Sequence, residues 1–210
     1  MTAGRAAESP RIGPMKRLAL TAAALALAQP AAALDFTWRA DGRTIAVDAT
    51  GDFELHSADD LARFLAAEAP LFHGRRVASI SFDSTGGNAL GAWNMAQMVH
   101  ARRLNTSVAG SGQCASACVL SWAAGATKSI PYNGAVGVHR CAADTPADAD
   151  RCTEGSAALL SAAGAPPSVV DALMTTEPDE LHWLTAAELS AWGTRVTTGA
   201  TNGAPLRQRP

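Results

Sequence analysis

The chain has 210 residues, which is enough for one domain or for one domain with a tail. Hydrophobic residues make up 48% of the chain and charged residues 17%, so it can bury a sizeable core. The formal net charge of −2 gives no electrostatic basis for binding nucleic acid or an anionic membrane surface.

The N-terminal segment has the pattern of a signal peptide. A basic pair precedes an uncharged apolar run at residues 18–28, and small alanines follow at 31–33. That run fits the roughly 7–15 residues of a signal-peptide hydrophobic region and is shorter than the roughly 20 that span a bilayer. We therefore expect residues 1–33 to be removed and the mature protein to be periplasmic or secreted. Met15 could be the true start, and an uncleaved membrane anchor is the alternative.

The first half of the mature chain alternates between strand and helix patterns. In chain order we expect a strand at 44–49, a helix capped by Ser57, a strand at 77–82, a helix at 89–102 and a short strand at 106–109.

The second half continues the alternation. We expect a helix at about 115–124, a strand at 135–139, helices at 154–163 and 167–175, and a last helix capped by Thr185, with Glu188 three residues on. Such alternation predicts one α/β layered domain over residues 34–196, followed by a disordered tail at 197–210.

Three segments carry candidate chemistry. A double glycine at the end of Ser84-Thr85-Gly86-Gly87 follows a strand and could present backbone N–H groups to a bound oxygen. Ser116 is expected in the first turn of its helix, where the helix dipole favours negative charge. His139 ends a strand and could act as a base if it reaches the serine.

The four cysteines are interpreted through the expected export. An even number in an oxidising compartment favours two disulfides, and three pairings are possible. We favour Cys114–Cys118 with Cys141–Cys152. Zinc held by the CxxxC pair and His139 is the competing interpretation, although this spacing matches no standard zinc motif.

The order of these segments, over residues 43–193, resembles the proteolytic subunit of the Clp protease and its crotonase-like relatives. The chain looks most similar to a branch of secreted bacterial proteins with a CxSAC segment. This resemblance implies a ClpP/crotonase-like α/β fold of stacked ββα units. It also implies Ser116 as nucleophile, His139 as general base, and the N–H groups of Gly87 and Ala117 as the oxyanion hole.

The resemblance fails at the third catalytic position. Leu181 stands where the family has an aspartate, while Glu177, Asp179 and Glu180 lie close by and could substitute. Without such a carboxylate the site would be a dyad, or the protein would not be an enzyme. Related signal-peptide peptidases use a Ser/Lys pair, but we interpret Lys128 as a solvated surface charge.

Together these features predict an exported serine hydrolase that acts on peptides or proteins, without a metal or other cofactor. The alternative is a non-catalytic crotonase-fold module that binds a peptide or a protein partner. Acyl-thioester chemistry ranks low because an exported protein rarely meets coenzyme A. The resemblance allows a homo-oligomer, and we expect neither nucleic acid nor an ATP-driven unfoldase as a partner.

Overall fold

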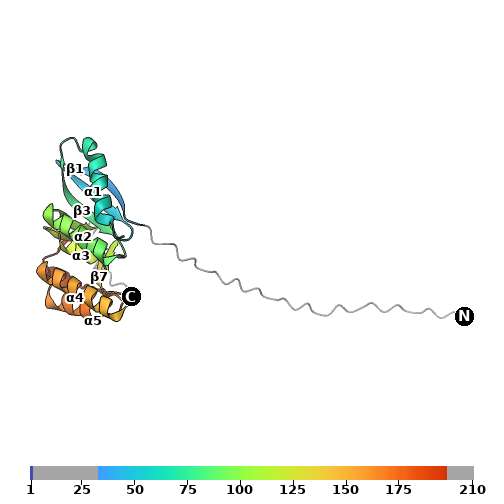
Figure 1. The fold of residues 1–210 in the computed structure, drawn as a ribbon. Coiled ribbons are helices and arrows are strands. Elements are labelled where there is room, and N and C mark those ends of the chain that lie inside the picture. The colour runs from blue at the N-terminus through green and yellow to red at the C-terminus, as the bar shows by residue number, and fades with distance from the viewer. Residues whose placement is uncertain (2–32, 198–210) are drawn as a thin grey trace. The chain divides into compact units, whose positions relative to one another are not determined.

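The structure is a computed structural model that describes residues 33–197 and Met1 (Figure 1). The expected signal peptide, except for Met1 and Ala33, and the expected tail beyond Thr197 lie outside the described residues. Within residues 33–197, no helix is both long and apolar enough to cross a bilayer.

A six-stranded sheet forms the larger layer of the domain. Its order is β1-β2-β3-β4-β6-β9, and only β1 runs antiparallel to its neighbour. Ile45, Val47, Ile80 and Phe82 are almost fully buried, so the interior strands β2 and β3 contribute to the core. The strands are β1 (Asp35–Asp41), β2 (Thr44–Thr50), β3 (Arg76–Asp83), β4 (Asn105–Val108), β6 (Lys128–Pro131) and β9 (Arg195–Thr197).

A second, three-stranded sheet contains the two strands that directly precede Ser116 and His139. It consists of β5 (Gln113–Ala115), β7 (Ala135–Val138) and β8 (His182–Trp183), in the order β5-β7-β8. β5 and β7 are parallel, so their carboxyl ends lie at the same edge of this sheet.

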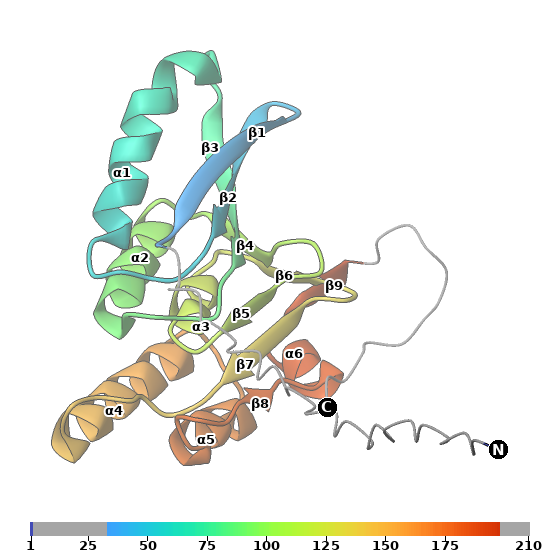
Figure 2. The same cartoon turned by 90° about the vertical axis from the view of Figure 1, so that its right-hand side faces the viewer.

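In the described part of the chain, six α-helices and one short 3₁₀ helix pack around the two sheets. Figures 1 and 2 show α4 and α5 together at the end of the domain opposite the β1–β2 hairpin. The helices are α1 (Ser57–Glu68), η1 (Ala69–Phe72), α2 (Ala89–Ala101), α3 (Cys118–Ala123), α4 (Pro146–Ala162), α5 (Pro167–Thr175) and α6 (Ala186–Ala191).

Side-chain caps fix where several of these helices begin. The Asn88 side chain accepts a hydrogen bond from the Gly91 amide at the start of α2. Thr185 and Glu188 form the expected capping box of α6. Burial of the Glu188 carboxyl opposes its ionisation, but hydrogen bonds from Thr185 and His182 outweigh that effect and lower the Glu188 pKa.

Helix α3 is the buried centre of the domain, and each of its residues is buried. Trp122 packs edge-on against Trp192, with ring centroids 5.3 Å apart. The Ser121 hydroxyl donates to the Ala92 carbonyl of α2 at 2.9 Å, and Thr106 of β4 donates to the Trp122 carbonyl at 2.7 Å. Because these buried hydrogen bonds join α3 to α2 and β4, they fix the position of the helix in the domain.

Several local expectations need correction. Ser57 does not cap α1, because its hydroxyl accepts from the Glu54 amide at 2.8 Å and His56 occupies the cap position. α4 begins at Pro146, earlier than expected, with Thr145 as its cap. Thr197, assigned to the tail, instead ends β9. The strands β1, β5, β6, β8 and β9 were not expected; four of them are too short to show a pattern.

Candidate active site

Ser116 lies in a tight turn between β5 and α3. β5 ends at Ala115, α3 begins at Cys118, and Ser116 has a φ of 54°. This corrects the expectation that Ser116 belongs to the first turn of the helix: it precedes the helix, because a left-handed residue cannot continue a right-handed one. Non-glycine residues in this conformation are uncommon and are enriched at functional sites.

The double-glycine turn packs directly against this serine. Gly86 and Gly87 have φ values of 124° and 109°. A Cβ on Gly86 would lie 2.6 Å from the Ser116 Cβ, and one on Gly87 would lie 2.4 Å from the Phe53 carbonyl oxygen. Both positions therefore require glycine, for backbone conformation and for space.

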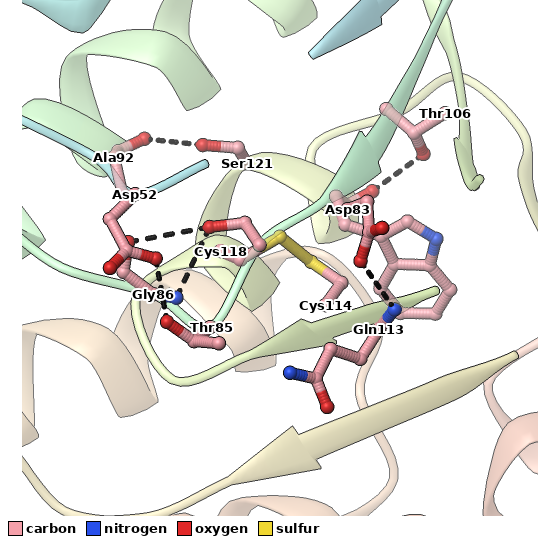
Figure 3. Close-up of a disulfide and its surroundings, with 12 residues drawn as sticks. Asp52, Asp83, Thr85, Gly86, Ala92, Thr106, Gln113, Cys114, Cys118 and Ser121 are labelled. Carbon is pink, nitrogen blue, oxygen red and sulfur yellow. Dashed lines mark hydrogen bonds between the residues drawn. A yellow bond between two sulfur atoms is a disulfide. The ribbon is translucent and has the colours of Figure 1, made fainter. Parts of the chain in front are cut away.

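Two hydrogen bonds hold the double-glycine turn against β5. The Ser84 amide donates to the Gln113 carbonyl at 2.8 Å, and the Ala115 amide donates to the Ser84 carbonyl at 3.1 Å. The Gln113 amide also donates to the Asp83 carboxylate at 3.0 Å (Figure 3). The end of β3 is thus fixed to the strand that leads into Ser116.

Two backbone donors border the serine. Within residues 33–197, neither the Gly87 amide nor the Ala117 amide donates a hydrogen bond to another residue. Gly87 is the second residue of the double glycine, and Ala117 directly follows the serine. A developing oxyanion needs such unpaired N–H groups.

The register of the second sheet joins the backbone at Ser116 to the strand that leads to His139. Ala115 pairs with Gly137, and the Ser116 amide donates to the Gly137 carbonyl at 2.9 Å. His139 directly follows Val138, the last residue of β7. The hydrogen bonds within residues 33–197 do not include one between Ser116 and His139.

Ser116 and His139 line the same pocket, which has a volume of about 250 Å³. Its apolar part includes Leu120 of α3 and Leu173 of α5. The complete lining is Gly87, Asn88, Ala89, Ser116, Ala117, Leu120, His139, Cys141, Ala142, Cys152, Ser156 and Leu173.

No carboxylate among residues 33–197 orients His139. Its Nδ1 atom is buried and has no hydrogen-bond partner there. Of the three candidate acids, Glu177 lies 3.7 Å from the Arg140 guanidinium, and Asp179 and Glu180 are exposed. The structure therefore brings Ser116 and His139 to one pocket and places none of these acids on the His139 ring.

Both disulfides lie at this site. Cys114–Cys118 encloses Ser116 in a loop, and both cysteines are fully buried (Figure 3). Cys141–Cys152 joins the segment after His139 to α4, and both of its cysteines line the pocket. This is the pairing favoured from the sequence, and a zinc site would lack the thiolates that it needs.

Lys128 lies away from this pocket. Burial lowers the pKa of Lys128, and its ammonium lies 5.8 Å from the centroid of the Trp192 ring. It is partly buried, in contrast to the solvated surface charge expected from the sequence. A Ser/Lys pair with Ser116 is not present, because Lys128 lines a different cavity.

Sequence reasoning missed several residues of the pocket. Leu173 and Ser156 belong to α5 and α4, which follow Ser116 by dozens of residues. Nothing in their local pattern distinguishes them from ordinary core residues of amphipathic helices. The contact between Gly86 and Ser116 was missed for the same reason, since only tertiary packing creates it.

Comparison with known proteins identifies the class of fold. No family model and no curated protein sequence matches the chain. Among solved structures, a mutant of the 1510-N membrane-bound stomatin-specific protease is similar, with a TM-score of 0.53 and 14% sequence identity. The match covers 74% of this chain and 78% of that one. The chain therefore has a mixed α/β, ClpP/crotonase-like fold.

Proposed function

We propose that this protein is an exported serine hydrolase that cleaves peptide bonds, with Ser116 as nucleophile and His139 as general base. The observation that carries the proposal is the left-handed Ser116 turn, which opens on the same pocket as His139. A serine on a sharp strand-to-helix turn holds its hydroxyl toward a substrate. Two disulfides are consistent with an oxidising compartment outside the cytoplasm.

The reaction follows from these positions. The Ser116 Oγ attacks the substrate carbonyl while His139 takes the hydroxyl proton. The resulting oxyanion accepts hydrogen bonds from the Gly87 and Ala117 amides. His139 then gives the proton to the leaving amine, and water hydrolyses the acyl-enzyme by the same steps. A bare Ser–His dyad is a slower catalyst than a triad, because no carboxylate orients or stabilises the imidazolium.

Labelling with a fluorophosphonate probe tests the proposal. The probe should label the wild-type protein once, at Ser116, and should not label Ser116→Ala or His139→Ala. Ser156→Ala is the matched control, because Ser156 lines the same pocket but is buried beside Cys141. That variant should label like the wild type. Labelling that persists in Ser116→Ala would reject Ser116 as the nucleophile.

A non-catalytic peptide-binding module is the second candidate. The observation that favours it is the unpartnered Nδ1 of His139, since a catalytic histidine is usually oriented by a second group. A folded wild-type protein that binds peptides in the Ser116 pocket but is not labelled by the probe would establish this function instead.

A further inference from the structure

A second and larger cavity lies at the opposite end of α3 from Ser116. Its volume is about 670 Å³, within the range typical of small-ligand sites. It shares no lining residue with the Ser116 pocket. Ser116 precedes the first residue of α3, whereas Ala123 and Ala124 at its C-terminal end line the larger cavity.

The walls of this cavity are mostly apolar. Trp93 of α2 and Leu159 of α4 contribute the large side chains, and alanines of α2, α3 and α4 supply most of the remainder. The neighbouring Gly125 cannot carry a side chain, because its Cβ would lie 2.1 Å from Thr106 Oγ1. Gly125 is therefore fixed as glycine by the packing of this segment against Thr106 of β4.

Three basic residues line the same cavity. They are His100, Arg103 and Lys128, and no lining residue is acidic. None of the three is in an ion pair with a carboxylate of residues 33–197, and none donates a side-chain hydrogen bond there. Burial lowers the pKa of Lys128, and the Trp192 ring faces its charge, with the ring centroid 5.8 Å from the ammonium. Arg103 has a φ of 53°, at a helix end where glycine is usual.

We propose that this cavity binds an amphiphilic carboxylate, with its apolar body against Trp93 and Leu159 and its carboxylate at Lys128 and Arg103. A bound carboxylate would give the partly buried ammonium an anionic partner, which residues 33–197 do not supply, and apolar walls suit an alkyl chain. Two sources share this chemistry: a free fatty acid and the C-terminal carboxylate of a peptide that ends in an apolar residue. The proposal does not depend on catalysis at Ser116.

Titration calorimetry of the full chain with octanoate, and with octanol as its uncharged counterpart, tests the proposal. Octanoate should bind at least about tenfold more tightly than octanol, since the carboxylate adds a charged hydrogen bond in a partly desolvated site. Lys128→Met should remove that preference. The folded state should tolerate this change, because Lys128 makes no ion pair within residues 33–197 and methionine keeps an unbranched apolar side chain there. Equal binding of octanoate and octanol would overturn the proposal.

Three further variants locate the binding. Ala162→Trp, at an exposed lining position of α4, should block octanoate by filling the cavity. Arg151→Met removes an exposed charge elsewhere on α4 and should leave binding unchanged. Ser116→Ala should bind octanoate like the wild type, and a loss of binding there would place the ligand in the Ser116 pocket and overturn the proposal.

A further binding experiment with peptides distinguishes a free fatty acid from a peptide C-terminus as the ligand. An acetylated peptide that ends in leucine is compared with its C-terminal amide. Tighter binding of the acid, sensitive to Lys128→Met, would assign the site to peptide C-termini, and binding of octanoate alone would assign it to free fatty acids. If neither carboxylate binds and Lys128→Met alters self-association in sedimentation, a second copy covers the cavity and the proposal is wrong.

Discussion

The Ser116 wall of the candidate active site and its His139 wall differ in how their residues are held. Here the Ser116 wall means residues 113–118 with the double-glycine turn, and the His139 wall means residues 137–142. Ser116 lies within a five-residue disulfide loop, in contact with Gly86 and hydrogen-bonded to β7 through its amide. Among residues 33–197 the His139 Nδ1 has no hydrogen-bond partner, and the neighbouring Arg140 pairs with the exposed carboxylates of Asp150 and Glu177.

The difference shows that the fold constrains the Ser116 half of the site more tightly than the His139 half. Local covalent and steric constraints fix the nucleophile, because little movement is open to the Ser116 turn. The base depends on the end of β7 and on a disulfide to α4, which are more distant supports. Changes to the packing of the Ser116 wall should therefore lower both stability and activity. Changes in the His139 wall should lower one without an equal loss of the other.

The largest effect is expected from removing either catalytic group. Ser116→Ala and His139→Ala should each lower kcat/KM by on the order of 10³-fold or more, and the double variant should fall no further, because the two groups act as a unit. Circular dichroism should show all three variants folded, since neither change opens a large cavity. Losses that multiply in the double variant would mean that the two residues act independently.

Gly86→Ala should disrupt the Ser116 wall. The new Cβ would meet Ser116 at 2.6 Å in a backbone conformation with φ of 124°. We expect a loss of about 2–5 kcal/mol in unfolding free energy, from backbone strain plus overpacking, together with lost activity. Gly164→Ala is the control, because its φ is also positive, at 78°, but nothing lies within 4 Å of the added Cβ. Urea unfolding should show a smaller loss for this control, and equal losses would refute the steric argument.

The two disulfides should separate stability from activity. Replacing Cys141 and Cys152 by alanine opens the longer loop and should cost about 3 kcal/mol, against about 2 kcal/mol for Cys114 and Cys118. Activity should fall more when the Cys114–Cys118 disulfide is removed than when Cys141–Cys152 is removed, because Ser116 lies inside the shorter loop. Thermal unfolding measures the stability of each variant, and kcat measures its activity. Thiol counting on the denatured, unreduced wild type should find no free thiol.

The smallest effect is expected in the acidic loop. Glu177→Ala, Asp179→Ala and Glu180→Ala should each change kcat by less than about threefold, because none of these carboxylates contacts His139 within the described residues. The exposed Glu177–Arg140 pair contributes at most about 1 kcal/mol of stability. A hundredfold loss in any one variant would show that the loop moves to complete a triad when substrate binds.

Long, strongly patterned segments were predictable from the sequence. The strands at 44–49 and 77–82 and the helix at 89–102 agree with β2, β3 and α2 to within one residue at each end. The expected oxidising compartment predicted two disulfides but left three pairings open, and the favoured one agrees with the structure. Three-residue strands such as β5 carry too few residues for a period, so the turn at Ser116 was mistaken for the first turn of a helix.

The sequence by itself determined the α/β class and the residues worth testing, because hydrophobic periodicity and turn residues act over short stretches of chain. Only the tertiary structure decided that Ser116 takes a left-handed conformation, that Leu173 and Cys152 enter its pocket, and that Lys128 lies partly buried in another cavity. Each of these depends on contacts between residues far apart in the chain, where packing overrides local preference.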